Sequence, residues 1–383
     1  MSGMLHKEGR VVIIGAGPTG LGAALRLKEL GHYNFHIYES AGQVGGLAAS
    51  FKDAQGFTWD IGGHVQFSHY RYFDDLMDRA LAQGWLHHER ESWIWIENRF
   101  VPYPFQYNIR HLAPGTRWKC LQGLIQLSKH PSDSRPADFR QWIDATFGQG
   151  IAEIFMVPYN LKVWACPLES MDFNWIGERV AVVDLERVLF NLVHEKDDAC
   201  WGPNHTFRFP KVGGTGAVWE GVADLVGREH ISLRKEVVAV DPAAKAVALG
   251  DGSQDRYDVL ISTMPVNCLV QIAGLRRLQE PASRLRWSSS NIVGIGLSGR
   301  PPSALSKKCW MYFPEDNCPF YRVTVFSNYS PNNVPDISSQ WSLMAEISES
   351  PHKPVDRGHL IEDVIDGMLA TKLIERSNDI LST

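Results

Sequence analysis

The stretch VVIIGAGPTG at residues 11–20 decides the fold of this chain. Its apolar run, 11–14, predicts a buried strand. Gly15, Gly17 and Gly20 follow in G-x-G-x-x-G spacing, which is typical of the turn into a dinucleotide-binding helix. The first glycine permits the turn, the second lets the backbone reach a pyrophosphate, and the third lets helix and strand pack closely. Because the helix also begins with unpaired N–H groups that favour phosphate, we predict a dinucleotide site here.

An acidic residue, Glu39, follows the glycine turn at the distance typical of a ribose-binding carboxylate in dinucleotide sites. Glu39 lies nineteen positions after Gly20 and ends a predicted strand, 35–39, that follows a predicted amphipathic helix, 21–30. A carboxylate in this position accepts hydrogen bonds from a ribose hydroxyl. A lone glycine turn also joins strands to helices without any nucleotide, but here the strand, the helix and the spaced acid agree.

Composition indicates a globular protein that must hold any anionic ligand through local arginines. The chain has 383 residues, enough for two or three domains, of which 44% are hydrophobic and 21% charged. A net charge of −5 gives no support for a nucleic-acid partner. No apolar run has membrane-spanning length and no secretory signal is present, so we expect no membrane partner. Six cysteines without regular spacing favour reduced thiols and a cytoplasmic location, and a homo-oligomer is left open.

Two further glycine clusters suggest a cofactor larger than NAD that lies along the protein. They are GQVGGLAAS at 42–50 and the glycine pair within FTWDIGGHVQF at 57–67. Short strands return at 231–263, so the nucleotide domain is expected to be discontinuous. We expect an α/β fold, α+β overall, in which a Rossmann-like domain is joined by an α-helical domain and an antiparallel β-sheet substrate domain.

The predicted boundaries follow these changes of pattern. The nucleotide domain comprises 1–95 and 205–265, and the helical domain comprises 110–204, with helices at 116–129, 138–147, 151–164 and 179–193. Alternating segments at 291–297, 309–313, 321–329 and 340–347 predict the sheet domain, which comprises 96–109 and 266–356. Residues 357–383 form a last helix and the start of a strand at which the chain stops.

Several longer motifs resemble the eukaryotic-type UDP-galactopyranose mutases of the flavin amine oxidase superfamily. VGGL at 44–47 resembles the superfamily's V-G-G-R, with Leu47 in place of arginine. The closer matches are GGHVQFSHYRYFDD (62–75), PYPFQYNI (102–109), PYNLKVWA (158–165), GERVA (177–181), WGPNHTFRFP (201–210), WMYFPEDNCPFYR (310–322) and SNYSP (327–331).

The resemblance implies an FAD-binding domain at 1–95 and 205–265 and a uridine-binding helical domain. It implies isomerisation of UDP-galactopyranose to UDP-galactofuranose without net redox change. In that reaction N5 of reduced FAD acts as a nucleophile at the anomeric carbon, and NADPH is the expected reductant.

Three residues receive catalytic roles through this resemblance: His64, Arg179 and Arg322. The two arginines match the family's diphosphate-binding pair, because guanidinium forks bind phosphate oxygens at two points. His64 lies on what resembles the histidine loop over the flavin, and its chemical role is left open. From the residues alone, Arg179 beside Glu178 suits a surface ion pair, and a lone histidine is usually a surface or core residue.

The resemblance also implies two sets of binding residues. The cofactor set is Gly15, Gly17, Pro18, Thr19, Gly20, Glu39, Ser40, Gly45, Gly46, Leu47, Gly62, Gly63, His64 and Val237. The substrate set is Tyr103, Phe105, Gln106, Phe155, Asn160, Trp164, Arg179, Asn204, Tyr312, Arg322 and Tyr329. Aromatic rings suit stacking on uracil and amides suit its edge, although such rings also fill cores. The histidines lack partners at metal-ligand spacing, so we predict no metal site.

Three hypotheses remain open. Family members continue past the point where this chain ends, with tyrosines and an arginine that contact the diphosphate and a glycine-rich stretch that contacts the flavin. The chain is therefore a mutase, an FAD-dependent oxidoreductase of the same superfamily that acts on another substrate, or a truncated, non-catalytic remnant that binds flavin or nucleotide. The paired arginines favour the first hypothesis over the second, and the early end favours the third over the first.

Overall fold

The computed structural model describes residues 9–81, 83–130, 134–177, 180–198, 202, 205–376 and 378–383. The chain divides into two compact units. Unit 1 comprises Met1–Asp53, Thr58–Leu86 and Phe209–Arg286, and unit 2 comprises Ala54–Phe57, His87–Arg208 and Trp287–Thr383. Each unit combines helices with a sheet, which confirms the predicted fold class.

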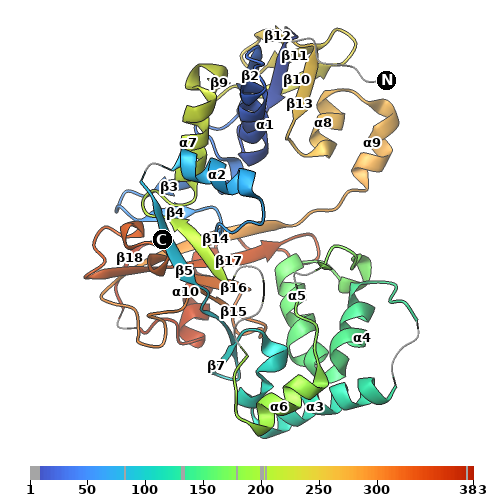
Figure 1. Cartoon of the computed structure of the whole chain (residues 1–383), viewed down its shortest axis with the longest axis vertical. Coiled ribbons are helices and arrows are strands. Elements are labelled where there is room, and N and C mark those ends of the chain that lie inside the picture. Colours follow the sequence, from blue (N-terminus) through green and yellow to red (C-terminus); the bar gives the residue numbers. More distant parts are fainter. Residues whose placement is uncertain are drawn as a thin grey trace. The chain divides into compact units, whose positions relative to one another are not determined.

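Unit 1 is built on a parallel sheet with the strand order β13 (Val259–Ser262), β1 (Val11–Ile14), β2 (Phe35–Tyr38) and β9 (Ile231–Ser232). Every residue of β1 is buried because both faces of the sheet are covered. Alternate residues of β1 pack into two clusters, one that includes α1 (Pro18–Glu29) and α7 (Gly216–Val226) and one that includes β10 (Val237–Asp241) and β11 (Ala246–Leu249). Figure 1 shows α1 and α7 side by side. The predicted strand, turn, helix and second strand are confirmed.

The third segment of unit 1 returns the chain to this sheet. β13 pairs in parallel with β1, in the register Val11↔Val259, so unit 1 is assembled from separate segments of the chain. The unit ends later than predicted, because helices α8 (Val266–Ile272) and α9 (Arg276–Ser283) belong to it and not to the sheet domain. Its other elements are η1 (Gly46–Ala48), β3 (Ser50–Lys52), β4 (Thr58–Asp60), α2 (Arg71–Ala80), η7 (Arg228–His230) and β12 (Gln254–Arg256).

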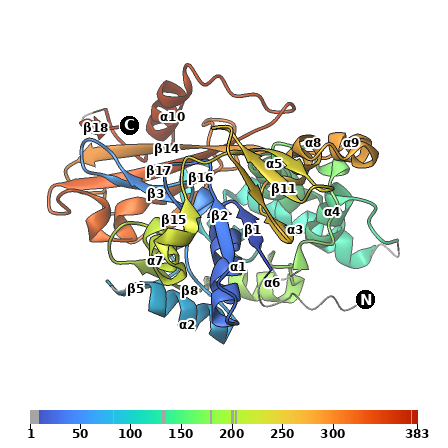
Figure 2. The same ribbon diagram turned by 90° about the horizontal axis from the view of Figure 1, so that it is seen from above.

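Unit 2 contains a seven-stranded sheet. Its order is β18 (Ile380–Ser382), β14 (Ser289–Ser298), β17 (Gln340–Glu349), β16 (Arg322–Val325), β15 (Trp310–Tyr312), β6 (Ser92–Ile96) and β7 (Arg99–Pro102). The predicted antiparallel segments form its centre, and β14 and β17 pair along their whole length (Figure 2). β6 was placed in the nucleotide domain by the predicted boundary at 95, but it pairs with β15 and β7 and so belongs to this sheet.

The helices of unit 2 comprise one that packs on the sheet and a separate helical part. α10 (Leu360–Ala370) packs its Val364 and Met368 into the core of the sheet. The helical part consists of α3 (Pro114–Lys129), α4 (Phe139–Ile151), a π-helical turn (Ala152–Met156), α5 (Val157–Trp164) and α6 (Leu185–Val193). Short 3₁₀ turns are η2 (Phe105–Tyr107), η3 (Ile109–His111), η5 (Leu168–Ser170), η8 (Phe326–Asn328) and η9 (Pro331–Asn333). β5 (Trp85–Glu89) and β8 (Thr206–Pro210) pair with each other, and one boundary between the units falls within each of these strands.

Local capping sets where these helices begin. The Asp138 side chain accepts the N–H of Gln141 at 2.8 Å and starts α4 as predicted. The helix predicted at 179–193 is shorter, because the side chain of Asp184 accepts the N–H of Arg187 at 3.0 Å and α6 begins at Leu185. α3 begins at Pro114, two residues before the predicted start at 116.

α3 and α4 cross at a contact that only glycine permits. A Cβ on Gly123 would lie 2.7 Å from the backbone N of Gly150. A Cβ on Gly148 would lie 2.6 Å from the carbonyl of Gly123, and Gly148 has a φ of +67°. Because the obstacles are backbone atoms, no side-chain movement relieves them.

None of the helices within the described residues is both long and apolar enough to span a membrane. The five cysteines in that part of the chain, Cys120, Cys166, Cys268, Cys309 and Cys318, are free thiols.

The helix crossing predicts a contrast between two identical substitutions in α3. Gly123→Ala should lower the free energy of unfolding by about 2 kcal/mol or more, because the two backbones must separate. Gly115→Ala meets no atom within 4 Å and should be neutral or stabilising by up to about 1 kcal/mol. Urea unfolding followed by circular dichroism measures both, and equal stabilities would refute the contact.

Candidate functional site

The first two glycine clusters meet in unit 1 and form a cradle of backbone. The N–H of Gly45 donates to the carbonyl of Ala16 at 2.9 Å. A Cβ on Gly46 would lie 3.2 Å from the Cα of Gly17, and one on Gly20 would lie 1.9 Å from the carbonyl oxygen of Gly15. Gly17 caps α1 without any side-chain hydrogen bond, and Pro18 follows. The first N–H groups of α1 therefore have no side-chain cap, which fits the pyrophosphate of a dinucleotide.

Glu39 is placed beside this cradle, at the end of β2. One carboxylate oxygen, Oε2, accepts the N–H of Ala16 at 2.8 Å, and Oε1 accepts the N–H of Ala41 at 2.7 Å and the hydroxyl of Ser40 at 3.2 Å. The carboxylate thus ties the glycine turn to the end of β2. A carboxylate oxygen can accept two hydrogen bonds, and Oε2 accepts one within the described residues, so the predicted ribose contact is compatible with this arrangement and stays a prediction.

The remaining cofactor residues lie in the same unit. Thr19, Ser40, Gly46 and Leu47 are exposed and available to a ligand. Val237 is buried, and the segment before it runs along Glu39, where the N–H of Lys235 donates to the Glu39 carbonyl at 2.8 Å. The structure thus brings the segment that leads to Val237 beside Glu39, the predicted ribose contact.

The third glycine cluster follows a buried carboxylate. Asp60 ends β4 and is 1% exposed. It accepts the Thr215 N–H at 3.0 Å and hydroxyl at 2.8 Å, at the start of α7, and also the hydroxyl of Ser50. Gly62 continues with a φ of +95° into the loop of Gly63 and His64, of which His64 is half-buried. Burial raises the pKa of Asp60 to about 6, although the hydrogen bonds from Ser50 and Thr215 lower it. Asp60 therefore anchors the base of the predicted histidine loop.

Five aromatic rings of unit 2 form one contiguous aromatic cluster that joins predicted substrate residues. Ring centroids lie 4.6 Å apart for Phe105 and Phe155, 5.3 Å for Phe155 and Tyr159, 5.2 Å for Tyr159 and Tyr312, and 5.6 Å for Tyr312 and Tyr103. Phe105 and Phe155 are buried in the helical core, so they act there as packing residues. Tyr103 and Tyr312 are only half-buried. Burial raises the pKa of both phenols, so they remain protonated donors at neutral pH.

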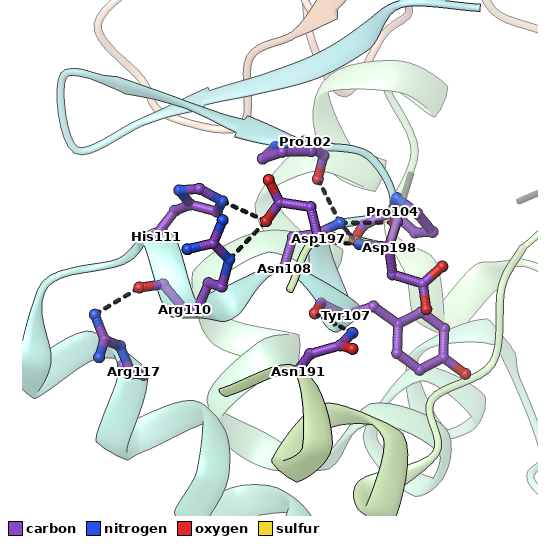
Figure 3. Close-up of polar contacts among 10 residues, drawn as sticks. All are labelled: Pro102, Pro104, Tyr107, Asn108, Arg110, His111, Arg117, Asn191, Asp197 and Asp198. Atoms are coloured by element: carbon purple, nitrogen blue, oxygen red, sulfur yellow. Dashed lines mark hydrogen bonds and ion pairs between the residues drawn. The ribbon is translucent and has the colours of Figure 1, made fainter. Parts of the chain in front are cut away.

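The tract at 102–109 is held in place by its own buried amides (Figure 3). Nδ2 of Asn108 donates to the carbonyls of Pro102, Pro104 and Asp198, at 3.1, 3.0 and 2.9 Å, and Oδ1 accepts the Asp198 N–H at 2.9 Å. The amide nitrogen of Gln106 donates to the Ala181 carbonyl. The described contact of Gln106 is structural, and its predicted contact to uracil stays a prediction.

Figure 3 also shows how this tract is tied to its surroundings. Nε of Arg110 and Nε2 of His111 both contact Oδ1 of Asp197, at 2.6 and 2.7 Å, and Asn191 donates to the Tyr107 carbonyl at 3.2 Å. The adjoining segment, 197–198, is thereby fixed from two sides.

Asn160 and Trp164 lie one turn apart on α5 and bond to each other. Nε1 of Trp164 donates to Oδ1 of Asn160 at 3.1 Å, and Nδ2 of Asn160 donates to the Met156 carbonyl at 2.7 Å. Both side chains are half-buried. Asn160 and Trp164 therefore lie on one face of α5, and their contact with a ligand stays a prediction.

Arg322 is held by a two-point ion pair. Nε donates to Oε1 of Glu346 at 2.6 Å and Nη2 donates to Oε2 at 2.7 Å. The two residues face each other across β16 and β17, and Tyr312 on β15 opposes Arg322 from the other side. Burial alone would lower the pKa of Arg322, but the Glu346 carboxylate raises it well above its usual value. Arg322 is therefore a permanent cation beside the aromatic cluster.

The other predicted substrate residues either are buried in the core, where they are less accessible to a ligand, or lie outside the described residues. Tyr329 is 1% exposed and packs against Phe207 and Phe326, so its described role is that of a core residue. Arg179 and Asn204 lie outside the residues that the structure describes. Their predicted contacts to diphosphate and sugar stay predictions.

Comparison with known proteins places the chain in a family. A family model described as flavin containing amine oxidoreductase matches residues 18–350. The chain belongs to this family. A crystal structure of reduced UDP-galactopyranose mutase matches with a TM-score of 0.95 and 48% identity, over 99% of this chain and 81% of that one. Within this family the chain resembles a UDP-galactopyranose mutase, as its motifs indicated. Both comparisons support FAD as its cofactor.

More distant matches show the shared fold. A structure of putrescine oxidase bound to putrescine matches with a TM-score of 0.64 and 15% identity, over 98% of this chain and 85% of that one. Zeta-carotene desaturases from Zea mays and from Synechocystis sp. are 40% and 35% identical over 75 and 74 residues, which are 20% and 19% of this chain. These stretches span only 13% and 15% of the desaturases' own lengths.

Sequence reasoning missed three residues of this site. Arg90 is buried, with its guanidinium carbon 5.2 Å from the ring centre of Tyr103, and nothing in its local sequence indicates this. Glu346 stands within the buried strand LMAEIS, where a lone acid signals a partner. Asn108 lies within the PYPFQYNI motif, but its anchoring role is visible only in three dimensions. Within the described residues, no group of three or more histidine, cysteine, aspartate or glutamate side chains is suited to hold a metal ion.

The glycine cradle predicts a position-specific loss of flavin. Gly46→Ala puts a Cβ against the Gly17 backbone at a φ of +52° and should greatly lower the flavin content. Gly22→Ala on α1 meets no atom within 4 Å and should keep full flavin content. The ratio of flavin to protein absorbance measures both. Full flavin in the Gly46→Ala protein would contradict the cradle.

Asp60 predicts a pH dependence of stability. The pKa of Asp60 is about 6 in the folded protein, above the ordinary value of 3.8 that applies to the unfolded chain. The protonated side chain therefore stabilises the fold fully below pH 3.8, and this stabilisation is lost as the pH rises through 6. Between pH 5 and 8 this loss is about 1 kcal/mol. The stability of Asp60→Asn relative to wild type, measured by urea unfolding, should rise by that amount over the same range. A difference that does not change with pH would refute the assignment.

Proposed function

We propose that this chain isomerises UDP-galactopyranose to UDP-galactofuranose in its reduced flavin state. The proposal is supported by the 48% identity to a UDP-galactopyranose mutase over nearly the whole chain. The observation that carries it is the combination in unit 2 of a fixed arginine, Arg322, with the aromatic cluster. A nucleoside diphosphate needs both a cation for its phosphates and flat rings for its base.

In the proposed reaction, the bond between the anomeric carbon and the β-phosphate oxygen breaks, and UDP leaves with the electron pair. Negative charge grows on the leaving oxygen as the bond lengthens. An arginine donor that strengthens its hydrogen bond as this charge grows lowers the barrier instead of only holding the substrate. The same bond re-forms at the end, after a different sugar hydroxyl has closed the ring. Substrate and product are therefore at the same oxidation level.

Phenols near the same point can share this task. Tyr312 opposes Arg322 in the sheet, and its hydroxyl accepts Nε1 of Trp310 at 2.6 Å. The phenol remains protonated because burial raises its pKa, so its own O–H is a donor for a phosphate oxygen. Tyr103, next in the aromatic cluster, has Arg90 over its ring. We assign these groups to the phosphates and the base, together with Arg179 and Asn204.

The glycine cradle and Glu39 would hold the dinucleotide of the flavin, and the loop of His64 would lie over its ring. When bound and reduced, the flavin supplies the nucleophile, N5, for the anomeric carbon. NADPH is the proposed reductant, and a cytoplasmic location is proposed with it. An oxidoreductase acting on another substrate is the alternative, since the family as a whole is described as oxidoreductases.

Arg322→Ala should separate flavin binding from UDP binding. Arg322 lies in the sheet of unit 2 and the glycine cradle lies in unit 1, so flavin content should stay at the wild-type level. UDP affinity should fall at least tenfold and turnover of UDP-galactofuranose at least a hundredfold, which is about 3 kcal/mol in the barrier. Calorimetry with UDP and chromatography of the products, under anaerobic reduction, measure these.

Arg300→Ala is the matched control, because Arg300 contacts a backbone carbonyl, that of Ser338, and lies outside the proposed site. It should bind UDP and turn over like wild type. Wild-type UDP affinity in the Arg322→Ala protein would refute the proposed site.

A further inference from the structure

The carboxylate of Glu346 is one of the most buried charges in unit 2. Its side chain is 3% exposed, against 27% for its partner Arg322. Three donors hydrogen-bond to it within the described residues: Nε and Nη2 of Arg322 and the hydroxyl of Tyr321, the last at 2.8 Å to Oε2. A buried carboxylate is retained only when it is paired in this way. No part of the proposed reaction uses Glu346 as an acid or a base.

The pair leaves one side of the guanidinium available. Nε and Nη2 both face Glu346, and among the described residues no acceptor for Nη1 is present. The 27% exposure of the Arg322 side chain fits an edge of N–H donors, including those of Nη1, that points away from the carboxylate. Since a two-point pair fixes the plane of the guanidinium, Glu346 also fixes the direction of that edge.

The pair also changes the charge that Arg322 brings to an anion. Arg322 and Glu346 together are neutral, so a diphosphate is attracted to Arg322 mainly as an oriented hydrogen-bond donor. A donor of this kind acts most strongly where charge develops during the reaction and less on the charge already present in the substrate.

From these contacts we propose that Glu346, supported by Tyr321, is a positioning residue that orients Arg322 toward the leaving oxygen of a nucleoside diphosphate. The inference rests on the proposed function and extends it to a residue that does not touch the substrate. It states that Glu346 serves the chemical step more than substrate binding. A merely structural carboxylate would affect both together with stability.

The test uses the full chain with bound, reduced flavin. In Glu346→Gln the amide keeps the shape, but its NH₂ opposes one N–H of Arg322, so the two-point pair is lost. Arg322 regains its uncompensated charge and loses its orientation. The value of kcat for UDP-galactofuranose should fall 10- to 100-fold, while the Kd for UDP stays within threefold of wild type or becomes tighter.

Glu349→Gln is the matched control on the same strand. Glu349 also pairs with an arginine, Arg357, at 2.8 Å, but it makes no contact with Arg322. Both kcat and Kd should remain at wild-type values. Flavin content and the midpoint of thermal unfolding are recorded for every variant.

A second variant, Tyr321→Phe, tests the positioning role of Glu346 if Glu346→Gln fails to fold. Tyr321→Phe removes one of the three donors and keeps the ion pair, so kcat should fall several-fold with unchanged Kd for UDP. If Glu346→Gln folds, an unchanged kcat, or a parallel loss of kcat and UDP affinity, would overturn the inference. If Glu346→Gln does not fold, an unchanged kcat in Tyr321→Phe would overturn it. If wild type shows no turnover, or if Arg322→Ala binds UDP like wild type, the proposed function itself fails, and the two failures are thus distinct.

Discussion

The paired charges of Arg322 and Glu346 constrain the centre of unit 2. A carboxylate in a buried strand loses its water, and the two-point bond to Arg322 and the hydroxyl of Tyr321 help to replace it. The pair forms only in the register that sets Arg322 opposite Glu346, and the same register sets Tyr312 opposite Arg322. A slip of one residue would turn all of these side chains to the other face. Sheet register and site geometry are thus one constraint.

The two units would meet the tasks of the proposed function by different physical means. In unit 1, the glycine clusters at 15–20 and 45–46 approach each other closely, so backbone N–H groups and a helix terminus would hold a phosphate there. In unit 2, charged and aromatic side chains are held by buried hydrogen bonds, of which those of Asn108 tie the tract at 102–109 to Asp198. A mutase needs both kinds of site, since the flavin dinucleotide must be held while a second diphosphate leaves and returns.

Local patterns of sequence predicted the elements well and the long-range pairings poorly. The apolar run 11–14, the glycine spacing and the apolar periodicity of 138–147 are local patterns, so the strand, the turn and α4 could be predicted. The parallel pairing of β6 with β15 joins residues more than two hundred positions apart and has no local signal. The ion pair of Arg322 depends on strand register, and the partner of Glu346 is not visible in its own strand. The roles of Arg322 and the tyrosines came from motif resemblance, because residue types alone suit a core equally well.

The most direct test of the mutase account is a count of turnovers per electron pair. The flavin of the full chain is reduced anaerobically with one equivalent of dithionite, UDP-galactofuranose is added in large excess, and product and flavin absorbance are followed together. The account predicts many molecules of UDP-galactopyranose per flavin while the flavin stays reduced, because substrate and product are at the same oxidation level. Reoxidation of one flavin for each sugar nucleotide consumed, or no product from a fully reduced flavin, would contradict it.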